Sequence, residues 1–141
     1  MSIMHEMEEL LQKKVSGSST KKKSKGNLLI IDDNRSIVQA LCEILKDDFE
    51  ITCTYSCEES IEKVNQSHQI ALLDVKMPGN DGIITFNLLK EKLLDLKIVF
   101  HSAYPGNYDK VLQVQEMSHF GYFTKGEYSN QELIDHLNNL L

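Results

Sequence analysis

The chain has 141 residues, of which 41% are hydrophobic and 26% are charged, a balance typical of one folded domain rather than of a disordered chain. Its net charge of −6 is unevenly spread, because residues 1–26 hold six lysines and three glutamates whereas residues 27–141 hold nine basic and eighteen acidic residues. An acidic folded part repels nucleic acid, and no apolar run approaches the roughly 18 residues that a membrane span requires. We therefore expect no nucleic-acid partner and no membrane partner. The N-terminus also lacks the apolar core of a secretory signal, so we expect a cytoplasmic location.

The first 26 residues differ in amino-acid composition from the rest of the chain. Apolar residues within 1–14 recur at helical spacing and predict a short amphipathic helix. Residues 15–26, VSGSSTKKKSKG, combine serine, glycine and lysine with almost nothing apolar, which is typical of a linker. We therefore expect a helix-prone arm and a basic linker over 1–26, followed by one folded domain over 27–141.

The three cysteines predict neither a disulfide framework nor a zinc site. Cys42, Cys53 and Cys57 lack a CxxC spacing and are odd in number. We expect them to serve as small buried hydrophobic side chains.

From residue 27 onward, short apolar runs alternate with longer segments of helical periodicity. The runs predict five strands, at Leu28–Ile31, Ile51–Cys53, Ile70–Leu73, Ile98–Phe100 and Tyr122–Phe123. The first, third and fourth runs are continuously apolar, as expected for strands that are buried on both faces of a parallel sheet.

The segments between the strands predict helices. Their apolar stripes are Ile37, Leu41, Ile44 and Leu45; Ile61 and Val64; Phe86, Leu89 and Leu93; and Leu133, Ile134, Leu137, Leu140 and Leu141. A weaker stripe predicts a further helix near Tyr108–Met117.

Two serine–glutamate pairs predict capping boxes where helices begin, Ser56 with Glu59 and Ser129 with Glu132. The whole alternation predicts an α/β fold, a (βα)5 doubly wound sheet of five parallel strands in the flavodoxin-like order 2-1-3-4-5. Right-handed crossovers then place helices on both faces of the sheet. In such folds, ligands bind beyond the carboxyl ends of the strands.

Polar residues end four of the five predicted strands. Asp32 and Asp33 follow the first strand, Asp74 the third, Ser102 the fourth and Lys125 the fifth. Carboxylates about 4 Å apart repel by about 4 kcal/mol per pair at an effective dielectric constant of ~20. A hard divalent cation such as Mg²⁺ offsets this repulsion, and Lys125 can neutralise the remaining charge. One carboxylate then stays ionised as a nucleophile, for which a phosphoryl group is the natural electrophile.

Four motifs at these strand ends resemble those of a known family: LLIIDDN, LLDVKMPGNDG, HSA and GYFTKG. Together they resemble the receiver domain of two-component response regulators, over about residues 27–141. The resemblance implies acceptance of a phosphoryl group from a phosphohistidine on a sensor histidine kinase or a histidine phosphotransfer protein. It implies output through phosphorylation-dependent binding of a downstream protein target, or through a phosphorelay. A receiver is consumed as the acceptor, so we do not expect an independent enzyme.

The resemblance assigns roles to the residues at the strand ends. Asp74 is the implied phosphoacceptor. Asp32 and Asp33 are the implied acidic pair that holds Mg²⁺ together with Asp74, with Asp33 the more direct ligand and the backbone carbonyl of Lys76 a further one. Lys125 is implied to pair with the acceptor and with the phosphoryl oxygens.

The resemblance also implies a switch and an output surface. Ser102 occupies the position whose hydroxyl turns toward the phosphoryl group, and Tyr122 the position whose ring then turns inward. The expected output surface comprises Tyr104–His119 and Tyr122–Leu141, with Tyr104 and Tyr108 as further contact residues.

Two departures from the family's pattern stand out. The family usually has a proline after the lysine of the fifth strand, often in a cis peptide, whereas this chain has Gly126. A cis bond without proline costs about 3 kcal/mol, so we predict a trans Lys125–Gly126 bond and a loop that holds Lys125 less tightly.

Lys76 places a positive charge two residues after Asp74, which predicts a phosphoryl lifetime that is either longer or shorter than is usual in the family. Equal dephosphorylation rates for the wild type and Lys76→Asn would contradict this prediction.

Three other classes remain as alternatives. A flavodoxin-like cofactor binder has the same fold, but Asp32 and Asp33 would repel a cofactor phosphate. A haloacid-dehalogenase-type phosphohydrolase requires a second aspartate where this chain has Lys76. A pseudo-receiver would bind proteins without phosphorylation, yet it should have lost Asp74, Lys125 or the acidic pair.

Overall fold

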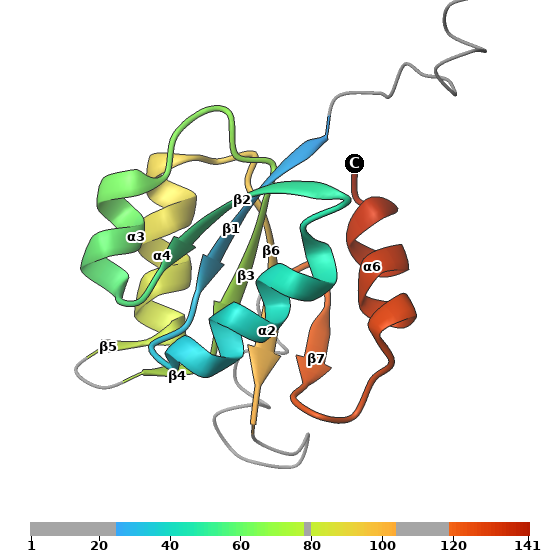
Figure 1. Cartoon of the computed structure of the whole chain (residues 1–141). Helices are drawn as coiled ribbons and strands as arrows, with labels where there is room; N and C mark the ends of the chain where they lie inside the picture. The colour runs from blue at the N-terminus through green and yellow to red at the C-terminus, as the bar shows by residue number, and fades with distance from the viewer. Residues whose placement is uncertain (1–24, 78–79, 104–118) are drawn as a thin grey trace, which may run out of the picture.

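The computed structural model describes residues 25–77, 80–103 and 119–141 (Figure 1). Five parallel strands form one sheet in the order β2-β1-β3-β6-β7, which confirms the predicted order 2-1-3-4-5. The strands are β1 (Gly26–Ile31), β2 (Phe49–Thr54), β3 (Ile70–Asp74), β6 (Lys97–Ser102) and β7 (Tyr122–Thr124).

Helices cover both faces of this sheet, as the crossover rule predicts (Figure 1). One layer contains α3 (Cys57–Lys63) and α4 (Gly82–Lys92), and the opposite layer contains α2 (Arg35–Leu45) and α6 (Asn130–Asn138). Alternate residues of the strands enter two separate cores: Leu29, Ile31 and Leu73 face the α3–α4 layer, whereas Leu28, Ile30 and Leu72 face the α2–α6 layer. None of the described helices is long and apolar enough to cross a membrane.

The strands lie where the apolar runs predict them, with longer bounds. The side chains of Leu28–Ile31 and Ile70–Leu73 are at most 1% exposed, because both strands are covered on both faces. The first strand begins at Gly26, one residue before the predicted domain boundary. At its other end, β3 includes Asp74, which the apolar pattern could not assign to the strand.

Helix caps confirm one predicted box in full and the other in part. Ser129 accepts a hydrogen bond from the backbone of Glu132, whose carboxylate accepts one from the Ser129 backbone. Ser56 likewise accepts from the backbone of Glu59. However, the Glu59 carboxylate accepts from the backbone N–H of Tyr55, 2.8 Å away, instead of from Ser56. The side chain reaches one residue further back, so the predicted reciprocal box at Ser56 is wrong.

A short antiparallel pair after β3 was not predicted. The strands β4 (Lys76–Met77) and β5 (Asn80–Asp81) pair with each other and lead into α4, which begins at Gly82. Gly82 is required there, because an added Cβ would lie 2.6 Å from the Asp74 carbonyl oxygen. The predicted helices within 1–14 and near Tyr108–Met117 lie outside the described residues.

All three cysteines are free thiols. Cys57 is buried as predicted, whereas Cys42 and Cys53 are half-buried and their Sγ atoms lie 3.1 Å apart. Burial, together with the hydrogen bond to Cys42, raises the pKa of Cys53 to about 12. Nothing in the spacing of the cysteines indicated this contact between α2 and β2.

Candidate functional site

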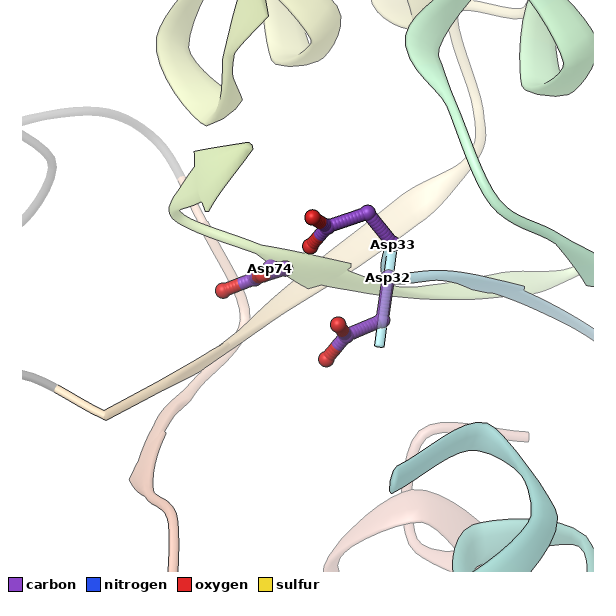
Figure 2. Close-up of side chains that lie close together, drawn as sticks. All are labelled: Asp32, Asp33 and Asp74. Atoms are coloured by element: carbon purple, nitrogen blue, oxygen red, sulfur yellow. The ribbon is translucent and has the colours of Figure 1, made fainter. Parts of the chain in front are cut away.

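Three carboxylates meet at the carboxyl edge of the sheet. Asp32 and Asp33 follow β1 and Asp74 ends the neighbouring β3, so the pairing of these strands brings the three together. One carboxylate oxygen from each residue lies within 4.8 Å of the others. Figure 2 shows that the three carboxylates point to the same side. Asp32 and Asp74 are 2% and 5% exposed, whereas Asp33 is exposed to solvent.

Local hydrogen bonds hold the loop that carries the acidic pair. The backbone N–H of Asp32 donates to the Thr54 carbonyl, 3.2 Å away. Asp32 Oδ1 accepts from the backbone N–H of Asn34 at 2.9 Å. Asn34 is itself the N-cap of α2, since its side chain accepts from the backbone N–H groups of Ser36 and Ile37. The cap thereby fixes the direction in which the chain leaves the site.

Lys125 supplies the positive charge at this edge. It follows β7, and its Nζ lies 2.8 Å from Asp32 Oδ2 and 3.6 Å from Asp74 Oδ1. Its side chain is only 17% exposed, so the ion pairs are poorly screened by solvent. The backbone N–H of Lys125 donates to the Ser102 carbonyl, 2.7 Å away, which ties this residue to the end of β6.

The charges of the site fit a divalent cation. Three carboxylates and one ammonium group leave two negative charges, and carboxylates within 4.8 Å repel by at least about 3 kcal/mol per pair at an effective dielectric constant of ~20. Asp32 Oδ2 is buried and, apart from its ion pair with Lys125, has no hydrogen-bond partner among the described residues. An all-oxygen donor set with one solvent-facing carboxylate suits Mg²⁺, which keeps several of its waters. The residues present therefore fit such a cation.

Ser102 and Tyr122, the two residues of the predicted switch, lie beside each other. Ser102 ends β6 and is fully buried, and Tyr122 begins the adjacent β7. The Tyr122 ring packs against Phe100, with ring centroids 6.4 Å apart. Burial and the charge of Asp74 raise the pKa of Tyr122, while a hydrogen bond with the Ser102 side chain opposes this rise. Tyr122 therefore contacts the Ser102 side chain and lies close enough to Asp74 to respond to its charge.

The sequence reasoning missed a buried histidine behind the site. His101 pairs in register with Asp74 across β3 and β6 and is 3% exposed. Its Nε2 lies 2.7 Å from the hydroxyl of Tyr128, and its Nδ1 is buried without a hydrogen-bond partner among the described residues. Burial, reinforced by the charge of Lys125, lowers the pKa of His101 to about 4. A histidine that directly follows the apolar run Ile98–Phe100 was the sequence signal that could have identified it.

Two further predictions about this edge have different outcomes. Among the described residues the structure has no cis peptide bond, so the Lys125–Gly126 bond is trans, as predicted. Lys76 lies in β4, in register with Asp81, and the role of its carbonyl as a cation ligand stays a prediction.

Comparison with known proteins agrees with this arrangement. A family model described as "Response regulator receiver domain" matches residues 28–138. Response regulator SaeR from Staphylococcus aureus is 27% identical over 117 residues, which cover 82% of this chain and 50% of that protein. The chain therefore spans about half the length of the curated relatives that it matches.

Solved structures show the same fold. A CheY-like receiver domain protein from Methanospirillum hungatei aligns with a TM-score of 0.73 at 19% identity, covering 82% of this chain and 93% of that one. Response regulator TrrA from Thermotoga maritima, solved in complex with Mg²⁺ and BeF, aligns with a TM-score of 0.70 at 28% identity, covering 82% and 99%. The chain belongs to the response regulator receiver domain family, and modules of this kind act in two-component signalling.

Proposed function

We propose that this chain accepts a phosphoryl group on Asp74 from a phosphohistidine and relays a signal through that modification. The observation that carries the proposal is the cluster of three carboxylates within 4.8 Å, of which two are paired with Lys125 at 2.8 and 3.6 Å. Such a cluster is unfavourable in a merely structural role, because like charges repel. It suits a site that receives a phosphoryl group and a cation.

In the proposed reaction, a carboxylate oxygen of Asp74 attacks the phosphorus in line with the bond to the donor. An O–P bond to Asp74 forms while the P–N bond of the phosphohistidine breaks, and the electron pair stays on the ring nitrogen, which takes up a proton. Lys125 already lies 3.6 Å from Asp74 Oδ1 and can stabilise the charge on the transferred oxygens without rearrangement. Ser102 would donate its hydroxyl hydrogen to one of those oxygens.

Asp33, Asp32 and Asp74, with the backbone carbonyl of Lys76, would hold the Mg²⁺ ion. When bound, this ion neutralises negative charge that the phosphoryl group brings to the site. Asp33 is the exposed member of the cluster and is therefore the carboxylate most accessible to a hydrated cation. Asp32 is held by Asn34 and Lys125, which favours a role through a bound water.

The donor would be a histidine kinase or a histidine phosphotransfer protein in the cytoplasm. We propose residues 27–141 as the receiver domain, in agreement with the family match over 28–138, and residues 1–26 as an arm that precedes it. Ser102 and Tyr122 would change position on phosphorylation and alter the surface around β7 and α6 that binds a downstream protein. The acidic charge of this domain argues against direct binding of nucleic acid by these residues.

Intact mass after incubation with acetyl phosphate and Mg²⁺ tests the proposal. We expect a gain of one phosphoryl group that requires the metal and that is lost in Asp74→Asn. Asp47→Asn is the matched control, because Asp47 is an exposed aspartate in the turn before β2, at the opposite edge of the sheet. A wild type that gains no mass, while keeping its fold, would instead support the pseudo-receiver alternative.

A further inference from the structure

We propose that the hydrogen bond between His101 and Tyr128 is a clamp that holds the Lys125 loop and thereby positions the Lys125 ammonium group between Asp32 and Asp74. This inference rests on the proposed phosphoryl acceptance. It concerns residues 125–128, which join β7 to α6. We call these residues the lysine loop.

The lysine loop is fixed at its two ends, and a backbone hydrogen bond from Glu127 to the Thr124 carbonyl, 3.0 Å long, spans its first part. At its start, Lys125 donates its backbone N–H to Ser102, and at its end Ser129 caps α6. Between them, Gly126 adopts a φ of +81°, and an added Cβ there would meet nothing within 4 Å. Packing at Gly126 therefore does not define the path of the loop.

Tyr128 adds a side-chain anchor inside the core. Its hydroxyl lies 2.7 Å from His101 Nε2, and His101 belongs to β6, the strand between β3 and β7. The Tyr128 ring also makes edge contacts with His101 and Phe123, with centroids 5.6 and 5.3 Å apart. The loop is thus attached to the same strand whose end, Ser102, carries the backbone contact of Lys125.

The clamp acts through Lys125, because the histidine does not itself take part in the ion pairs of the site. The low pKa of His101 leaves its imidazole neutral near pH ~7, so it can hold the tyrosine hydroxyl without adding charge beside Lys125. A neutral anchor keeps the two negative charges of the site available for a cation. The lysine loop of this chain lacks a proline after Lys125, and the side-chain clamp constrains the loop in its place.

A loosened clamp should affect two measurable quantities in opposite directions. The phosphorylation rate should fall, because Lys125 is no longer held where the transferred oxygens arrive; a displacement near ~1 Å corresponds to about tenfold or more. Mg²⁺ affinity should rise about threefold, because a positive charge moves away from the cation site. General damage to the site would instead weaken both.

The experiment compares Tyr128→Phe, His101→Leu and His101→Gln in the full chain. We measure the rate of phosphorylation by acetyl phosphate and the Mg²⁺ dissociation constant by calorimetry. The first two variants should phosphorylate more slowly and bind Mg²⁺ about threefold more tightly. His101→Gln should restore both values, because the glutamine amide can still form a hydrogen bond with the Tyr128 hydroxyl. Tyr55→Phe is the matched control, since it removes a hydroxyl from a ring that packs against Arg35.

The remaining outcomes decide against the clamp. An unchanged rate in Tyr128→Phe overturns it, as does a loss of both rate and Mg²⁺ affinity. A Lys125→Ala background adds a second criterion: Tyr128→Phe should slow phosphorylation no further there, and an undiminished effect overturns the inference. If the wild type itself is not phosphorylated, the proposed function fails, and the Mg²⁺ affinity of Tyr128→Phe still tests the clamp.

Discussion

Acidification should destabilise this protein through His101. The folded state holds the pKa of this imidazole at about 4, because it is 3% exposed and faces the positive charge of Lys125. In the unfolded chain, a histidine titrates near pH ~6.5. As the pH falls below ~6.5, His101 therefore binds a proton in the unfolded state but not in the folded state. The contribution of the neutral His101 to the free energy of unfolding is fully present above pH ~6.5 and is lost between pH ~6.5 and the folded pKa of about 4.

The size of the effect follows from the two pKa values. Their difference corresponds to about 3 kcal/mol once the pH reaches the folded pKa, and to about 2 kcal/mol at pH ~5. The His101→Gln variant should lose this dependence, because its amide does not titrate. All other groups are common to the two proteins, so their contributions cancel in the difference.

Urea unfolding followed by circular dichroism, in EDTA between pH ~7 and pH ~4.5, measures these free energies. We expect the wild type to lose about 2 kcal/mol more than His101→Gln between pH ~7 and ~5. Tyr55→Phe is the control, because it removes only a hydroxyl from a ring that packs against Arg35, and it should keep the slope of the wild type. Parallel curves for the wild type and His101→Gln would refute the reasoning.

Three further predictions concern the same region. Gly82→Ala should lower the free energy of unfolding by about 1–3 kcal/mol and slow phosphorylation, since its Cβ would lie 2.6 Å from the Asp74 carbonyl oxygen; an unchanged urea midpoint would contradict this. Asp33→Asn should weaken Mg²⁺ binding at least about tenfold in calorimetry. An Mg²⁺ affinity of Asp33→Asn within about twofold of the wild type would show that Asp33 is not a ligand of the cation. Cys53 has a pKa of about 12, so only about one thiol in 10⁴ is ionised at pH ~8, and iodoacetamide should label it only after unfolding. Rapid labelling of Cys53 in the folded protein, seen by peptide mass mapping, would show that burial does not suppress the ionisation of its thiol.

Much of the fold and the members of the candidate site could be predicted from local pattern. The apolar runs Leu28–Ile31 and Ile70–Leu73 predict buried parallel strands, because only strands covered on both faces are apolar at every position. The residues that end such strands then lie at one edge of the sheet. For this reason Asp32, Asp33 and Asp74 could be assigned to one cluster before their distances were known.

Contacts between side chains from different elements could not be read from the chain. The sequence alone does not indicate that Lys125 lies closer to Asp32 than to Asp74, that Glu59 caps the backbone of Tyr55, or that Cys42 contacts Cys53. The pairing of His101 with Tyr128 is of the same kind. Periodicity determines which face and which end of an element a residue occupies. The separation between two side chains depends on the twist of the sheet, the packing of the helices and the rotamers, which only the assembled tertiary structure decides.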